Sequence, residues 1–206
     1  MGRLIDPDLK QLSAYLSEMG DLAIQCIQMA ISSYLEGKDT SRDVKALSDA
    51  IIERYDRVGD LTFHTLLKYQ PVASDFRFIR SAIEISQAFY RFGRYAYDIS
   101  LVRNKFGDIS HCRTEWLSGV SAEILQMTKN AVESFAVLDA SRAHILQTNE
   151  DYVDKLCRER IPMLIKHTDI RCALSEALLL LYLERIGDHA VFMGRSVNYI
   201  VTGRHE

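Results

Sequence analysis

The sequence contains 206 residues, with 25 Lys and Arg against 28 Asp and Glu, and its formal net charge is −3. Hydrophobic residues make up 48% of the chain, which is typical of a packed globular protein and excludes a disordered one. Three prolines and ten glycines are too few for a turn-rich β protein. The near-neutral charge gives no general attraction to nucleic acid or to an anionic membrane.

No stretch of the sequence has the character of a membrane span or an export signal. The longest apolar run covers residues 177–183, whereas a helix needs roughly 20 apolar residues to cross a bilayer. The first residues contain no apolar signal core, so we expect a cytoplasmic protein without direct membrane insertion. The four cysteines, Cys26, Cys112, Cys157 and Cys172, are widely spaced. We interpret them as free, buried thiols in a reducing cytosol.

Apolar residues recur at steps of three and four along most of the chain, which predicts amphipathic helices and no strands. Turn residues at Gly37, at Gln70–Pro71 and around Gly107 separate these helices. We expect Pro162 either to kink its helix or to end it early. The six helices are predicted to extend up to 36 and over about 41–69, 74–105, 113–138, 141–166 and 169–199.

The third and the sixth predicted helices are similar in sequence when one is shifted by 94 positions. Seven of thirty positions are identical, against about two expected by chance. A repeat with a period near 100 residues predicts two similar domains. We therefore predict an all-α protein of two tandem antiparallel three-helix bundles, residues 1–108 and 109–206. The identical pairs are Asp75 and Asp169, Arg77 and Arg171, Ser81 and Ser175, Arg91 and Arg185, Gly93 and Gly187, Ala96 and Ala190, and Asn104 and Asn198.

The second half carries two pairs of carboxylates at helical spacing. Glu184 and Asp188 lie four residues apart on the last helix, and Glu150 and Asp154 have the same spacing on the helix before it. On adjacent antiparallel helices these pairs would place four carboxylates together. Such oxygen ligands suit magnesium, manganese, calcium or iron. The alternative interpretation is a solvated acidic face with incidental arginine partners.

The first half keeps only one of these pairs. Asp49 and Glu53 lie four residues apart on its second helix, but Tyr90 and Arg94 stand where the second half has Glu184 and Asp188. Arg94 is able to supply the positive charge that a metal would otherwise provide. We therefore expect an ion pair from Arg94 to Glu53 or Asp49, with metal binding weak or absent in this half.

Other residues give weaker indications. Gly93 and Gly187 occupy equivalent positions inside helices, and we expect each to let a neighbouring helix approach closely, with shared ancestry as the alternative. His189 points away from Asp188 and is not expected to be a co-ligand. The other histidines, His111 among them, have no partner at ligand spacing and are interpreted as surface or capping residues.

Motifs for enzymatic chemistry are absent. The sequence contains no nucleotide-binding loop, no HExxH zinc motif, no GxSxG elbow and no dinucleotide fingerprint. It also lacks the Glu-x-x-His pairs that di-iron oxidase bundles require. No nucleophile with an obvious base is present, and we predict that the protein is not an enzyme.

Two stretches of the sequence resemble the PhoU family of phosphate-uptake regulators. They are residues 70–77, QPVASDFR, and the closing stretch, made of residues 183–190, LERIGDHA, followed by residues 198–203, NYIVTG. The resemblance implies a cytoplasmic, non-enzymatic regulator that contacts the ATPase subunit of the phosphate transporter and, in many bacteria, a sensor histidine kinase. It also implies damping of phosphate uptake and of starvation signalling, and a homodimer.

Several members of the family bind metal clusters through paired acidic residues. Carried over by position, the metal ligands would be Glu150, Asp154, Glu184 and Asp188, together with Asp49 and Glu53. The metal would be iron, manganese, magnesium or another ion. Tyr90 and Arg94 depart from the family pattern, which weakens the first site. The alternatives are a divergent helical metal-binding scaffold and a metal-dependent enzyme unrelated to phosphate transport.

Overall fold

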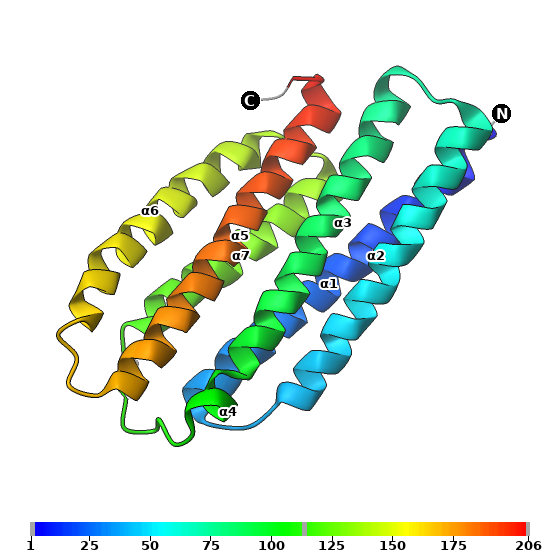
Figure 1. The fold of residues 1–206 in the computed structure, drawn as a ribbon. Helices are drawn as coiled ribbons and strands as arrows, with labels where there is room; N and C mark the ends of the chain where they lie inside the picture. Colours follow the sequence, from blue (N-terminus) through cyan, green and yellow to red (C-terminus); the bar gives the residue numbers. More distant parts are fainter. Residues whose placement is uncertain (1–2, 113–114, 205–206) are drawn as a thin grey trace.

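The structure, a computed structural model, describes residues 3–112 and 115–204, apart from the side chains of residues 143 and 144. Within these residues it is all-helical and contains no strand. Six long helices and one short helix follow one another along the chain (Figure 1). They are α1 (Asp6–Glu36), α2 (Ser41–Tyr69), α3 (Ala73–Ser100), α4 (Val102–Phe106), α5 (Leu117–Val137), α6 (Ser141–Leu164) and α7 (Ile170–Thr202).

Most helix ends lie where the sequence places them. Gly37 and Gly203 adopt left-handed φ angles of 74° and 75° and end α1 and α7. Glycine has no Cβ and takes this conformation at no steric cost. Gln70 is also left-handed and ends α2 just before Pro71. Pro162 lies inside α6, and this helix ends at Leu164, two residues after it. Of the two outcomes expected for Pro162, the structure shows the early end.

Two helices differ from their predicted bounds. The third predicted helix, 74–105, is interrupted at Leu101, so that α4 forms a separate short helix. Here the Ser100 hydroxyl donates a hydrogen bond to the carbonyl oxygen of Tyr97 at 2.7 Å, and such bonds compete with regular helical pairing. The predicted start of the fourth long helix, Arg113, lies outside the described residues, and α5 begins at Leu117.

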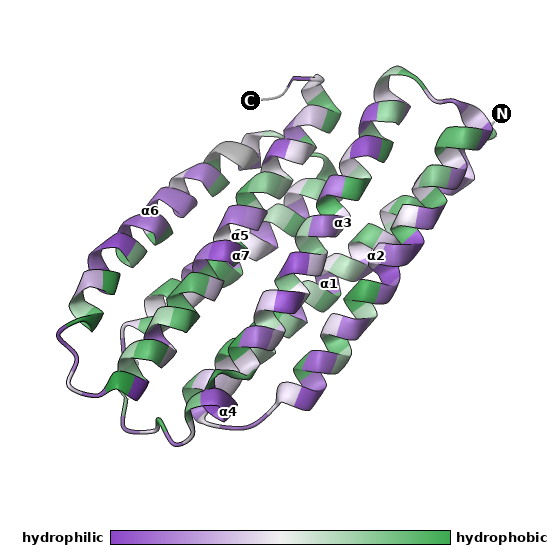
Figure 2. Cartoon of the chain, viewed as in Figure 1, coloured by the Kyte–Doolittle hydropathy of each residue, from purple (hydrophilic) through white to green (hydrophobic). Residues whose placement is uncertain are grey.

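The long helices form two antiparallel bundles that lie side by side. The first contains α1, α2 and α3, and the second contains α5, α6 and α7. The central helices α3 and α7 pack against each other and join the bundles (Figure 1). One continuous hydrophobic core includes residues of both bundles. Figure 2 shows that α6, at the outer edge, is mostly hydrophilic. None of the described helices combines the length and apolar character that crossing a membrane requires.

Polar and aromatic contacts reinforce the packing of α3 against α7. The Ser81 hydroxyl donates to the carbonyl oxygen of Ser196 at 3.2 Å, and the Ser196 hydroxyl donates to Glu84 at 2.9 Å. The ring of Tyr95 stacks on that of His189, with 6.0 Å between centroids. His189 thus belongs to the contact between the bundles. These bonds satisfy polar groups that the apolar interface would otherwise leave without partners.

The two equivalent glycines pack differently. A Cβ on Gly93 would lie 3.0 Å from Cδ1 of Ile51 and 3.4 Å from Cα of Ser48, so α2 approaches α3 closely at this point. A Cβ on Gly187 would meet Cδ1 of Ile124 at 3.4 Å, an ordinary van der Waals contact. The expected close approach is confirmed at Gly93, whereas the contact at Gly187 is looser.

Candidate functional site

The structure brings the four carboxylates of the second half to one face of the α6–α7 pair. Glu150 and Asp154 come from α6, and Glu184 and Asp188 come from α7. All four side chains are partly buried. Their charges act on one another across the two helices, because Asp154 repels both Glu184 and Asp188. We call these four residues the acidic quartet.

Burial raises the pKa of Glu150, Glu184 and Asp188, since removal from water disfavours their charged forms. The repulsion from Asp154 raises the pKa of the same three carboxyls further. The Cys157 thiol is buried beside the quartet, and burial raises its pKa to about 12. The thiol therefore stays neutral beside the four carboxylates.

Basic side chains neutralise only part of the negative charge of the acidic quartet. Arg185 Nη1 lies 3.1 Å from Asp188 Oδ2. The side-chain amide of Gln147 donates to Glu150, and its oxygen accepts a hydrogen bond from Arg195 at 2.7 Å. In the described part of the chain, no basic group lies within ion-pair distance of Asp154 or Glu184. Like charges that share a partly buried face favour the binding of a cation between them.

Asp49 and Glu53 of the first bundle are exposed, and each pairs with basic residues of its own helix. Lys45 Nζ lies 2.5 Å from Asp49 Oδ2, and Arg57 Nη2 lies 2.6 Å from Glu53 Oε1. A second arginine, Arg54, lies 3.2 Å from Glu53. These i,i+4 pairs compensate the charges of Asp49 and Glu53.

The two α3 residues that replace the acidic pair make aromatic contacts. The ring of Tyr90 packs against Tyr55 of α2, with 5.2 Å between centroids. The Arg94 guanidinium lies 5.9 Å from the centre of the Tyr97 ring. The expected ion pair from Arg94 to Glu53 or Asp49 is therefore wrong, because nearer basic groups on α2 already pair with both carboxylates.

Comparison with known proteins assigns this architecture to a family. The family model described as "PhoU domain" matches the chain twice, over residues 16–102 and 117–197. The chain belongs to the PhoU family. The two matches fall on the two bundles, which confirms the tandem architecture, while the boundary between 108 and 109 stays a prediction.

Relatives and solved structures resemble this chain over nearly its whole length. The homolog 1 of the phosphate-specific transport system accessory protein PhoU from Mycobacterium leprae is 30% identical, over 95% of this chain and 91% of its own. A homolog from Synechocystis sp. is 24% identical, over 96% and 91%. The crystal structure of PhoU from Pseudomonas aeruginosa superposes with a TM-score of 0.91 at 23% identity, covering 97% of this chain and 99% of that one.

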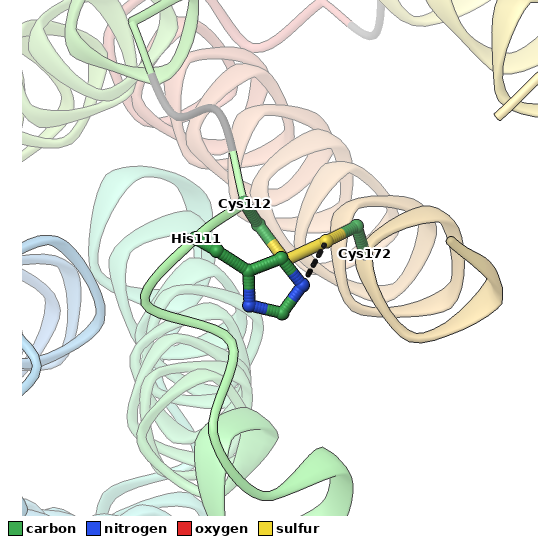
Figure 3. A group of neighbouring side chains, drawn as sticks. All are labelled: His111, Cys112 and Cys172. Carbon is green, nitrogen blue, oxygen red and sulfur yellow. Dashed lines mark hydrogen bonds between the residues drawn. A yellow bond between two sulfur atoms is a disulfide. The ribbon is translucent and has the colours of Figure 1, made fainter. Parts of the chain in front are cut away.

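A second cluster of reactive side chains lies at the start of α7. Cys112 and Cys172 form a disulfide, although the sequence predicts free thiols at both positions (Figure 3). That prediction is wrong because the loop before α5 folds back onto the first turn of α7 and places the two Cα atoms 5.4 Å apart. It is confirmed for Cys26 and Cys157, which are free and buried.

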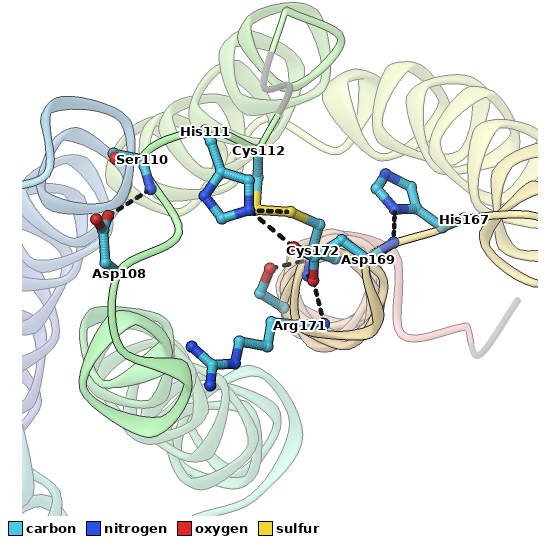
Figure 4. The surroundings of a disulfide bond; sticks show 9 residues. Asp108, Ser110, His111, Cys112, His167, Asp169, Arg171 and Cys172 are labelled. Carbon is cyan, nitrogen blue, oxygen red and sulfur yellow. Dashed lines mark hydrogen bonds and ion pairs between the residues drawn. A yellow bond between two sulfur atoms is a disulfide. The ribbon is translucent and has the colours of Figure 1, made fainter.

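His111 and Asp169 complete this cluster. His111 Nε2 lies 2.8 Å from Asp169 Oδ2 and 3.5 Å from Cys172 Sγ (Figure 4). The contact with His111 and the backbone N–H groups of Cys172 and Arg171 lower the pKa of Asp169. Sequence reasoning missed the cluster because its cysteines are 60 residues apart and show no ligand spacing. The available signals were the adjacent pair His111–Cys112 and the position of Asp169 three residues before Cys172.

Proposed function

We propose that this PhoU-family protein is a cytoplasmic regulator of phosphate uptake. It restrains the high-affinity phosphate transporter and phosphate-starvation signalling by binding the ATPase subunit of the transporter and a sensor histidine kinase. Membership of the family supports this role, as does the name of its relatives, accessory proteins of the phosphate-specific transport system.

We further propose that the acidic quartet binds metal ions such as iron, manganese or magnesium. The supporting observation is that Asp154 and Glu184, partly buried beside two further carboxylates, have no basic partner among the described residues. No three of the four carboxylates have oxygen atoms that all lie within 4.8 Å of one another in the part of the chain that the structure describes. Bound ions would therefore draw the side chains together. Their excess positive charge would attract phosphate or an acidic segment of a partner.

Metal content tests this assignment directly. Tag-free wild-type protein is compared with Glu184→Ala/Asp188→Ala by inductively coupled plasma mass spectrometry. The matched control is Asp49→Ala/Glu53→Ala, which removes the equivalent pair of the first bundle. We expect bound iron, manganese or magnesium in the wild type and in the control, and the loss of that metal in the α7 variant. Folded wild type that holds none of these three metals after purification without chelators would refute the proposed metal site.

Partner binding tests the regulatory role separately. Wild-type protein is used to capture the purified transporter ATPase subunit and the cytoplasmic part of the sensor kinase. We expect binding to at least one of them, weakened in Glu184→Ala/Asp188→Ala and retained in Asp49→Ala/Glu53→Ala. Absence of binding to both, with phosphate uptake unchanged in cells that lack the protein, would contradict the regulatory role.

We propose no catalytic role, because the quartet supplies carboxylates but no partner group for acid–base or nucleophilic chemistry.

We also propose that the protein is a homodimer. Light scattering on the eluting protein measures its mass, and a monomeric mass over a wide range of concentrations would contradict the dimer. Turnover of a phosphorylated substrate that disappears in Glu184→Ala/Asp188→Ala would favour the enzyme alternative.

A further inference from the structure

The cluster formed by His111, Cys112, Cys172 and Asp169 is separate from the acidic quartet. Cys172 and Glu184 are twelve residues apart on α7, which corresponds to about 18 Å along the helix. The cluster borders an open pocket where the loop after α4 meets the first turn of α7. The proposed regulatory function makes no use of it.

The donor atoms of the cluster face a common point. His111 Nε2, Cys112 Sγ and Cys172 Sγ all lie within 4.8 Å of one another. They are the only group of three such ligand atoms among the described residues. Asp169 is not part of this group, but its Oδ2 lies 2.8 Å from the same His111 nitrogen and offers a fourth donor beside the three. Figure 3 shows the imidazole edge turned towards the disulfide.

Two of these donors are fixed by α7 itself. Asp169 is the N-cap of the helix, and its Oδ1 accepts backbone hydrogen bonds from Arg171 at 2.8 Å and from Cys172 at 3.3 Å. Because Oδ1 is occupied in this way, Oδ2 remains directed at His111 (Figure 4). Cys172 is buried in the same helical turn, whereas His111 is exposed. The cluster is therefore both positioned and accessible to a small ion.

The chemistry of this donor set selects zinc. Two sulfurs, one imidazole nitrogen and one carboxylate oxygen are the ligands that tetrahedral Zn²⁺ accepts, at about 2.0–2.3 Å from the ion. Magnesium and calcium prefer oxygen ligands only, which is the character of the acidic quartet. The two clusters of the second bundle thus differ in the class of metal that they suit.

We propose that the reduced form of this cluster is a zinc site, with Cys112, Cys172, His111 and Asp169 as its ligands, and that formation of the disulfide empties it. Both sulfurs are zinc ligands in one state and are bonded to each other in the other state. In a reducing compartment, persistent structural disulfides are rare and reversible ones are typical of redox sensing. The site would couple zinc binding to the thiol redox state of the protein.

The exchange between the two states balances as follows. A dithiol reductant transfers two electrons and two protons to the disulfide, the sulfur–sulfur bond breaks, and the reductant becomes a disulfide. The two cysteine thiols then release two protons as they form two bonds to Zn²⁺. Overall, the protein disulfide, the dithiol and Zn²⁺ yield the zinc dithiolate, the oxidised reductant and two protons.

The test uses the full-length Glu184→Gln/Asp188→Asn protein, which lacks the two α7 carboxylates of the quartet. The protein is reduced with a phosphine, freed of metal and titrated with Co²⁺, which gives thiolate-to-cobalt charge-transfer absorption only when sulfur is a ligand. Zn²⁺ is then added as the competitor. We expect one Co²⁺ per chain with this absorption, and complete displacement by Zn²⁺.

Further variants separate this site from the other thiols. Cys26→Ala/Cys157→Ala removes the two free cysteines and should retain the absorption, whereas Cys112→Ser/Cys172→Ser should abolish it. His111→Gln should shift the spectrum and weaken Zn²⁺ binding in protein that keeps both sulfurs. Absence of the absorption in reduced Cys26→Ala/Cys157→Ala protein with a wild-type circular dichroism spectrum would overturn the proposal, as would its persistence in Cys112→Ser/Cys172→Ser.

Oxidation tests the coupling to the disulfide. After treatment with oxidised glutathione, thiol titration in denaturant should find two thiols per chain, those of Cys26 and Cys157. The same sample should give no thiolate–cobalt absorption until it is reduced again. Four thiols after oxidation, or unchanged absorption in protein with two thiols, would overturn the redox coupling.

Discussion

The two bundles are copies of one repeat, but the acidic residues at equivalent positions have different surroundings in the two copies. On α2 of the first bundle, Asp49 and Glu53 are exposed and paired with basic residues one turn away. In the second bundle, Glu150 and Asp154 of α6 face Glu184 and Asp188 of α7, and basic partners are few. Duplication of a helical unit thus preserves the packing, while changes at two positions of α3 remove the acidic partner face.

The two bundles also differ at the start of the third helix of each repeat. Asp75 and Asp169 are equivalent in sequence, but Asp75 pairs with the side chain of Arg3 at 2.7 Å, whereas Asp169 caps α7. The Cys112–Cys172 disulfide is likewise confined to the second bundle. The disulfide and the proposed metal site therefore both lie in the second half of the chain.

The largest expected difference between the bundles comes from the disulfide. Cys112→Ser/Cys172→Ser should lower the free energy of unfolding of the oxidised protein by about 2–4 kcal/mol, because the bond closes a long loop in the unfolded chain. Urea denaturation with and without a reductant measures the effect. The two proteins should become similarly stable when both are reduced and metal-free, and a difference that persists there would contradict this explanation.

Alanine at the two equivalent glycines should have opposite effects. Gly93→Ala should cost about 1–3 kcal/mol, because its Cβ would press on Ile51 and on the backbone of Ser48. Gly187→Ala should be neutral or stabilising by up to about 1 kcal/mol, since alanine favours the helix and meets only ordinary contacts. Urea denaturation of both variants measures the difference, and equal effects would contradict the distinction.

The equivalent aspartates should also differ. Asp169→Ala removes a side chain that accepts two backbone hydrogen bonds at the start of α7, and should cost about 1–2 kcal/mol. Asp75→Ala removes an ion pair with an exposed arginine and should cost less than about 1 kcal/mol. Thermal unfolding of the two variants in low salt compares them, and a larger loss for Asp75→Ala would reverse the assignment.

The smallest expected effects concern the acidic pairs in metal-free protein. Glu184→Gln/Asp188→Asn should stabilise it by about 0.5 kcal/mol, because it removes repulsion within the quartet. Asp49→Asn/Glu53→Gln should destabilise it by a similar amount, because it removes attraction to Lys45 and Arg57. Chelator-treated samples measured by urea denaturation test the two signs, and the same sign for both variants would remove the contrast between the bundles.

Much of the fold follows from local sequence patterns. Gly37, Gly203 and Gln70–Pro71 end helices because backbone conformation at these residues depends on immediate neighbours. The break at Leu101 is not visible in the apolar periodicity, which continues through it. The candidate site divides in the same way: the spacing of Glu184 and Asp188 predicts a shared face, while the absence of a basic partner at Glu184 depends on side chains from other helices.

The sequence by itself determined the helices, their repeat in two bundles and the acidic pairs, because each of these depends on residues within about one helical turn or on comparison of the two halves. Only the tertiary structure decided that Cys172 meets both Cys112 and His111, and that Arg94 lies against the Tyr97 ring instead of pairing with Asp49 or Glu53. Pairing across 60 residues, and the choice among several nearby charges, depend on how helices pack and side chains orient, which no local spacing encodes.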